Sequence, residues 1–211
     1  MKSKLLAVTA GLIFSAMYLS GPAAATTFVF SVNLDGPSES PPNTSPGTGT
    51  GTVTFDDFLL SMNVNVAFKD LVPFTVTGAP SGTTASHIHC CTPTPGTGIA
   101  GVATQTPTFI GFPLGVLQGN YDHTFDMSLA ASYNAPFLAA NGNDPATAFA
   151  SLLAGAIAGE AYLNIHSTAF PAGEIRGFLN ETPLPATLPL FATGLGALGL
   201  LGWRRKRKAA A

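Results

Sequence analysis

Apolar and polar residues alternate with a period of two in several short stretches of the chain. The clearest stretch has Phe28, Phe30, Val32 and Leu34 at every second position. The same alternation recurs in the segments 59–68 and 119–129. Because successive side chains of a strand point to opposite faces, this pattern predicts half-buried β-strands.

Further short strands are expected at 50–55, 85–90, 160–166 and 174–179, with hairpin turns at Asp56-Asp57 and at 167–173. The segments 36–51 and 92–117 are rich in Pro, Thr and Gly, and are expected to be largely loop. One helix is predicted over 146–158, where Asn143 or Asp144 caps the start and Pro145 occupies the first turn. About seven short strands with one inserted helix indicate an all-β fold, an antiparallel sandwich or barrel.

The N-terminal segment has the three parts of a secretory signal peptide. Lys2 and Lys4 form a basic region, 5–19 is uncharged and apolar, and Ala23 to Ala25 supply small residues for cleavage. We therefore expect residues 1–25 to be a signal peptide and the mature chain to start close to Thr26.

The C-terminal segment predicts a second membrane-directed element. Residues 187–203 carry no charge, end in Trp203, and precede five consecutive cations from Arg204 to Lys208. A helix of this length measures about 25 Å, close to the thickness of a bilayer core. The cations are expected to stay cytoplasmic. The segment is either a permanent transmembrane anchor or a sorting signal that is removed.

The residues before this span favour a sorting signal. Pro183-Leu184-Pro185, followed by the apolar run and the basic tail, resembles the PEP-CTERM signal of Gram-negative bacteria, in the variant with Leu in place of Glu. The resemblance implies an exosortase-like processing enzyme as a partner. It also implies an inner-membrane-anchored precursor whose domain ends at the cell surface or in the extracellular matrix. The chain then divides into 1–25, a domain at 26–182, and a sorting signal at 183–211.

The charge of the central domain excludes one class of partner. Lys69 and Arg176 are its only cations, while all 11 acidic residues lie between Asp35 and Glu181. A surface that acidic does not bind a nucleic-acid backbone, because phosphates require cationic contacts.

Three histidines are the best candidates for chemistry. His87 and His89 lie two residues apart on an expected strand and so share a face. If the strand that ends at His166 lies nearby, three imidazoles converge and could bind zinc or copper. The alternative is that they form buried hydrogen bonds that hold loops on the sheet. The adjacent Cys90 and Cys91 leave three possibilities open: a vicinal disulfide, an intermolecular bridge, or thiolates on a metal.

No other residues indicate catalysis. Glu174 and Arg176 share a face and are expected to form a structural ion pair, with Glu160 as the other possible partner of Arg176. His123 lies among apolar aromatic residues and is expected to pack in the core. The sequence contains no nucleophile motif, phosphate loop or paired-carboxylate signature, so no enzymatic activity is predicted.

Several of these residues also carry a family resemblance. The motifs are Ser86-His87-Ile88-His89, Tyr162-Leu163-Asn164-Ile165-His166, Gly173-Glu174-Ile175-Arg176-Gly177, and the opening Leu34-Asp35-Gly36 with Glu39 and Pro41-Pro42. Together they resemble the CHRD domain family, which implies an all-β domain without an established catalytic activity. One departure is Cys90-Cys91, where the family commonly has Gly-Pro.

Two functional hypotheses follow. The leading one is an exported, non-enzymatic domain with a structural or interaction role toward extracellular polysaccharide or matrix proteins. The alternative is a zinc- or copper-binding envelope protein, a redox enzyme among its forms, that uses His87, His89 and His166.

Overall fold

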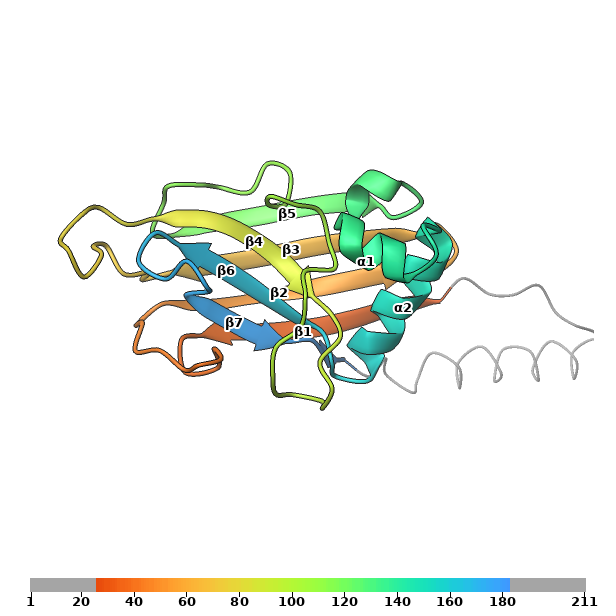
Figure 1. Ribbon diagram of the computed structural model, residues 1–211, viewed down its shortest axis with the longest axis horizontal. Helices are drawn as coiled ribbons and strands as arrows, with labels where there is room; N and C mark the ends of the chain where they lie inside the picture. Colours follow the sequence, from red (N-terminus) through yellow and green to blue (C-terminus); the bar gives the residue numbers. More distant parts are fainter. Residues whose placement is uncertain (1–25, 183–211) are drawn as a thin grey trace, which may run out of the picture.

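Each strand predicted from alternation forms part of one antiparallel sheet (Figure 1). The computed structural model describes residues 26–182. The strands are β1 (Thr27–Asp35), β2 (Thr48–Asp56), β3 (Ser61–Lys69), β4 (Thr83–His89), β5 (Gly119–Asp126), β6 (Tyr162–Ser167), β7 (Ile175–Phe178) and the short β8 (Asn180–Glu181). The expected signal peptide and sorting signal lie outside the described residues. Within 26–182 no helix has the length and apolar character to cross a membrane.

The strand order is β4-β6-β7-β1-β2-β3-β5, and β8 pairs with β1. Neighbouring strands are antiparallel, including the predicted hairpins β2–β3 and β6–β7. The two halves meet between β7 and β1, where the register contains one pair, Asp35 with Arg176. In Figure 1 the strands β4, β6 and β7 lie over β1, β2 and β3, so the sheet is a curled half-barrel. Of the two expected forms, a sandwich or a barrel, the barrel is the nearer, because one continuous curled sheet encloses the core.

The core fills the concave side of this sheet. Phe30 of β1 meets Phe55 of β2 edge-on, with ring centroids 5.7 Å apart. The edge strands β4 and β5 are bridged by the loop between them. Phe109 of that loop is fully buried, donates its backbone N–H to the Ser86 carbonyl (3.1 Å), and packs its ring 5.2 Å from that of Phe125. The long loop thus completes the wall that the strands leave open.

Helix α2 (Pro145–Ile157) forms where the sequence predicted it. The Asp144 carboxylate accepts the backbone N–H groups of Ala146 and Thr147, which satisfies donors that a helix start leaves unpaired. The buried side of α2 includes Phe149, whose ring meets Phe55 at 5.9 Å. A shorter helix that was not predicted, α1 (Ala135–Ala140), lies beside α2 at one end of the sheet (Figure 1).

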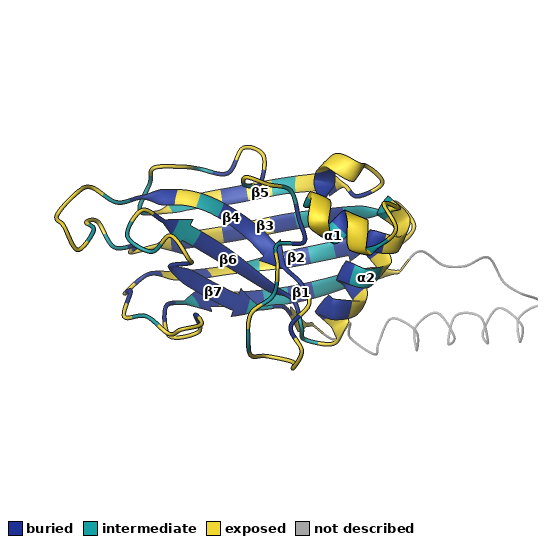
Figure 2. Cartoon of the chain, viewed as in Figure 1, coloured by how far each residue is buried: buried dark blue, intermediate teal, exposed yellow. Residues whose placement is uncertain are grey.

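The two halves of the sheet face different surroundings on their convex side. Strands β1, β2, β3 and β5 alternate between buried and more exposed residues, whereas β4, β6 and β7 are buried at nearly every position (Figure 2). Side chains on the second face of β4, β6 and β7 hydrogen-bond to the segments 36–45, 92–117 and 168–173. We call this the loop-covered face. It carries the polar residues that the sequence singled out.

Candidate metal centre

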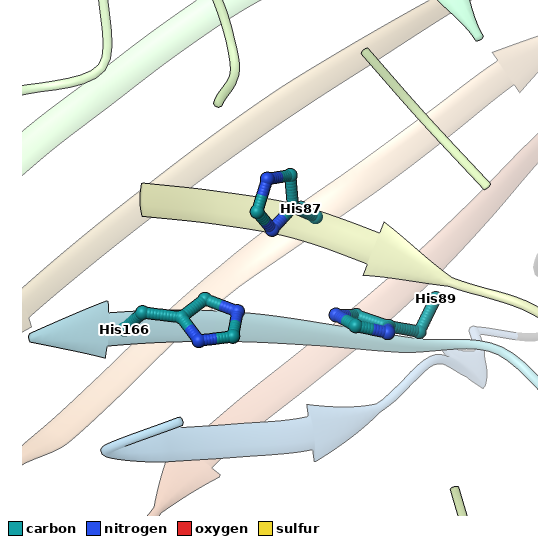
Figure 3. Close-up of side chains that lie close together, drawn as sticks. All are labelled: His87, His89 and His166. Carbon is teal, nitrogen blue, oxygen red and sulfur yellow. The ribbon is translucent and has the colours of Figure 1, made fainter. Parts of the chain in front are cut away.

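The structure brings the three predicted histidines together on the loop-covered face. His87 and His89 lie on β4, and the antiparallel register places Ala85 of β4 opposite His166 of β6. One ring nitrogen of each histidine lies within 4.8 Å of the corresponding nitrogens of the other two. The rings of His89 and His166 extend toward one another, with His87 beside them (Figure 3).

Each histidine is oriented by a backbone carbonyl of a covering loop. His87 Nε2 lies 2.7 Å from the Pro107 carbonyl oxygen and His89 Nδ1 lies 2.9 Å from that of Ala100. His166 Nδ1 lies 3.0 Å from the Pro171 carbonyl oxygen. A carbonyl oxygen only accepts, so in each ring the bonded nitrogen carries the hydrogen. The other nitrogen of each neutral imidazole therefore has no hydrogen and carries a lone pair.

Those lone pairs have no partner in the structure. His87 Nδ1, His89 Nε2 and His166 Nε2 are all buried and make no hydrogen bond. Leaving a buried polar atom unpaired typically costs about 1–3 kcal/mol, so three at one place require an explanation. The two interpretations, metal binding and hydrogen bonds to loops, are therefore compatible, because they concern different nitrogens of each ring. One nitrogen of each ring holds a loop, and the other is free to bind a ligand.

The geometry fits a single metal ion. In a tetrahedral zinc site with bonds of about 2.1 Å, ligand nitrogens lie roughly 3.4 Å apart. The candidate ligand atoms of the three histidines lie within 4.8 Å of one another, so binding one ion would require the rings to move closer together. Second ring nitrogens bound to carbonyl oxygens are the usual outer support of histidine ligands in metalloproteins. Three imidazoles suit zinc or copper.

The electrostatics keep the imidazoles neutral. Burial lowers the pKa of His89 to about 4, and the neighbouring His166, His87 and Arg176 lower it further, against the hydrogen bond to Ala100. Burial also lowers the pKa values of His87 and His166. A metal ligand must be unprotonated, so all three rings are in the binding form at neutral pH.

A stack of side chains supports His89 from one side. The ring of Tyr162 lies parallel to that of His89, with centroids 4.7 Å apart. Arg176 lies on the neighbouring strand β7, and its guanidinium is 4.7 Å from the ring centroid of Tyr162. Arg176 donates from Nε to the Ser38 carbonyl and from Nη1 to the Gly98 carbonyl (2.8 Å), so it holds two loops at once.

The ion pair expected between Glu174 and Arg176 does not form. Glu174 is fully buried, and its Oε1 accepts the Ser45 hydroxyl (2.7 Å) and the Val72 N–H (2.6 Å). Arg176 instead lies 3.9 Å from Glu39 Oε2. The period-two rule places Glu174 and Arg176 on one face, but Glu174 precedes β7 at a bend and its carboxylate bonds elsewhere.

Glu39 is a buried acidic residue beside Arg176 that the sequence did not assign to this face. It is 6% exposed, and its Oε1 has no hydrogen-bond partner. Burial raises the pKa of Glu39 to about 7, although Arg176 and the Ser40 backbone act in the opposite direction. The only signal in the sequence was its place in the Glu-x-Pro-Pro turn. Nothing in that pattern showed which strand the turn covers.

The remaining candidates take separate places. Cys90 and Cys91 form a disulfide with each other, which decides among the three possibilities for that pair. His123 lies on β5, away from the three clustered histidines in the strand order, and packs edge-on against Phe125 at 4.7 Å. His123 is half-buried, so the prediction that it packs in the core is met only in part.

Comparison with known proteins identifies one family. The profile described as the CHRD domain matches residues 30–179, which confirms the resemblance carried by the histidine motifs. No curated protein matches the chain. No solved structure matches it.

The raised pKa of Glu39 predicts a dependence of stability on pH. Between its ordinary pKa of 4.5 and about 7, the folded state holds the proton more tightly than the unfolded state. The stabilisation is therefore complete below the ordinary pKa and is lost as the pH rises through 7. Glu39→Gln keeps the shape and removes the titration. We expect the unfolding free energy of this variant to gain on the order of 2 kcal/mol relative to wild type between pH 5 and 8.

Urea unfolding at pH 5, 6, 7 and 8, with chelator present, measures this difference. The exposed Glu181→Gln variant is the matched control, and its curve should parallel that of wild type. Parallel curves for Glu39→Gln as well would show that the Glu39 carboxyl does not titrate in this range.

Proposed function

The chain belongs to the CHRD domain family, and we propose that its domain is an exported metal-binding module that holds zinc or copper on His87, His89 and His166. One observation carries this proposal. The three rings offer candidate ligand atoms within 4.8 Å of one another, and each ring has one buried nitrogen without a hydrogen bond among the described residues. A metal ion satisfies all three at once.

The kind of centre follows from the number of ligands. Three imidazoles leave one position of a tetrahedral site open to water or a small ligand. His166 is the most exposed of the three residues, whereas His87 and His89 are buried. Zinc would polarise a bound water molecule there. Copper would make the centre redox-active, and it binds nitrogen ligands more tightly than the other divalent metals of its row.

Elemental analysis tests the centre. The domain, purified without chelator and reconstituted with zinc or copper, should hold about one ion per chain. His87→Ala and His166→Ala should each lower the affinity at least about a hundredfold, because each removes one of three ligands. Circular dichroism of each variant checks that the domain is folded.

His123→Ala is the matched control, since it removes the one histidine among residues 26–182 that lies outside the centre. It should bind metal as wild type does. A folded domain that takes up neither zinc nor copper would refute the metal centre.

We further propose that the domain is delivered to the cell surface or the extracellular matrix. The supporting observations are the signal-peptide pattern at 1–25, the Pro183-Leu184-Pro185 motif with its apolar run and basic tail, and the disulfide at Cys90-Cys91. Disulfides persist in oxidising compartments outside the cytosol. In this proposal an exosortase-like enzyme removes the C-terminal segment from an inner-membrane precursor.

The mass of the mature protein tests this route. Intact-mass spectrometry of protein from the native host should show a chain that starts near Thr26 and lacks the cations Arg204 to Lys208. A Leu184→Ala precursor should keep them if the motif is recognised. Membrane-bound protein that retains the basic cluster in the wild type would instead establish a permanent anchor.

A second candidate function is adhesion to polysaccharide, and the convex face of β1, β2, β3 and β5 favours it. We call this the polar face. Across the strands its residues align in rows, Asn33-Thr50-Ala67-Asn120 and Ser31-Thr52-Asn65-Asp122. Most are exposed, and they carry hydroxyl and amide groups without any large apolar side chain. Such groups both donate and accept hydrogen bonds, as sugar hydroxyls do.

One end of the polar face is hollowed. A groove of about 450 Å³ is lined by Thr50, Ala67, Lys69, Gln118 and Asn120, among others. The small Ala67 pairs with Thr50 on one side and with Asn120 on the other. Lys69 also lines the groove, and its ammonium lies 3.3 Å from the Asp70 carboxylate.

Substitutions on the polar face test this candidate. The triple variant Thr50→Val, Thr52→Val and Asn65→Leu should lower retention on the matrix polysaccharide of the native host at least about tenfold, since several hydrogen bonds of about 1 kcal/mol are lost. Thr84→Val, an exposed threonine of β4, is the control. Equal retention of all three proteins would refute a role of the polar face.

A further inference from the structure

The disulfide between Cys90 and Cys91 stands at a junction of three elements. Cys90 directly follows His89, the last residue of β4. Cys90 is 6% exposed, whereas Cys91 is exposed. The pair therefore lies at the surface of the domain, with Cys91 as its exposed residue.

Both sulfurs rest on the backbone of helix α2 at Gly155. A side-chain carbon at this position would overlap the Sγ atoms of Cys90 and of Cys91. Bonded sulfurs are about 2.05 Å apart, while two separate thiols require roughly 3.5–4 Å. Both sulfurs pack closely against Gly155. Reduction lengthens the distance between the two sulfurs, so at least one of them would shift from this position.

The same residues are linked to the support of His89. The Cys90 N–H donates to the Gly101 carbonyl (3.1 Å), one residue beyond the Ala100 carbonyl that orients His89. His89 itself bridges to Val102. The segment 100–102 therefore contacts both the disulfide and the histidine. A displacement at Cys90 reaches the ring of His89 through this short segment.

We propose that Cys90–Cys91 is a site of thiol–disulfide exchange with a dithiol, and that its reduction weakens metal binding at the adjacent centre. The second half of this statement rests on the proposed function, and the first half does not. A thiolate of the dithiol attacks the exposed Cys91 Sγ, forms a mixed disulfide and releases Cys90 as a thiolate. The second thiol of the dithiol then displaces Cys91. Two electrons and two protons pass to the cysteines, and the dithiol becomes a disulfide.

The exchange is tested on the full chain without denaturant. Dithiothreitol is added without oxygen, followed by iodoacetamide and mass spectrometry, with circular dichroism to show that the protein stays folded. We expect both cysteines to be alkylated in the folded protein. Alkylation only after unfolding would overturn the exchange site.

The coupling is tested with zinc, which does not change its own redox state. The zinc dissociation constant is compared between the disulfide form, the doubly alkylated form and a Cys90→Ser, Cys91→Ser variant. Loss of an outer support typically costs a tenfold to hundredfold affinity, so we expect both altered forms to bind at least about tenfold more weakly. The Ser variant has no disulfide to reduce, so dithiothreitol treatment followed by removal of the reagent should leave its zinc affinity unchanged.

The possible outcomes distinguish the exchange site from its coupling to metal binding. Equal affinity of all three forms would overturn the coupling and leave the metal centre intact. Failure of the disulfide form itself to bind zinc or copper would refute the proposed centre and the coupling with it. Alkylation of the folded protein would still establish the exchange site in that case.

Discussion

The loop-covered face depends on hydrogen bonds from side-chain nitrogens to loop carbonyls. A loop that lies on a sheet buries backbone groups, and those groups need partners. Here the donors are histidine and arginine side chains of β4, β6 and β7. The acceptors are the carbonyls of Ser38, Gly98, Ala100, Pro107 and Pro171. Apolar side chains in these places would leave the carbonyls unpaired, at a cost that a small domain tolerates poorly.

The same bonds decide the chemistry of the histidines. Each bond fixes which ring nitrogen carries the hydrogen, and so fixes where the lone pair points. The loops that accept these bonds also exclude water, and their burial of the rings lowers the histidine pKa values. In this half of the sheet the same hydrogen bonds therefore hold the loops in place and determine the tautomer of each histidine. The other half, with its polar face in water, needs no such covering.

The sequence predicted what depends on short-range periodicity. Alternation located the strands, capping residues located α2, and the two-residue spacing placed His87 and His89 on one face. It could not show that the sheet is a single curled one, because that depends on strand order. The ion-pair partner of Arg176 could not be predicted either, because Glu39 lies on a loop whose path is set by tertiary packing. Likewise, the contact of both sulfurs with Gly155 joins segments that no local pattern relates.

The covering loops hydrogen-bond to the histidine rings through main-chain carbonyls, and among residues 26–182 no loop side chain is hydrogen-bonded to one of these rings. Every residue type offers the same carbonyl. The requirement on these loops is therefore one of path and length, and hardly one of residue identity. Substitutions along these loops can change the surface near the three histidines while the imidazoles keep their orientation. The architecture separates what must stay fixed from what is free to change during evolution.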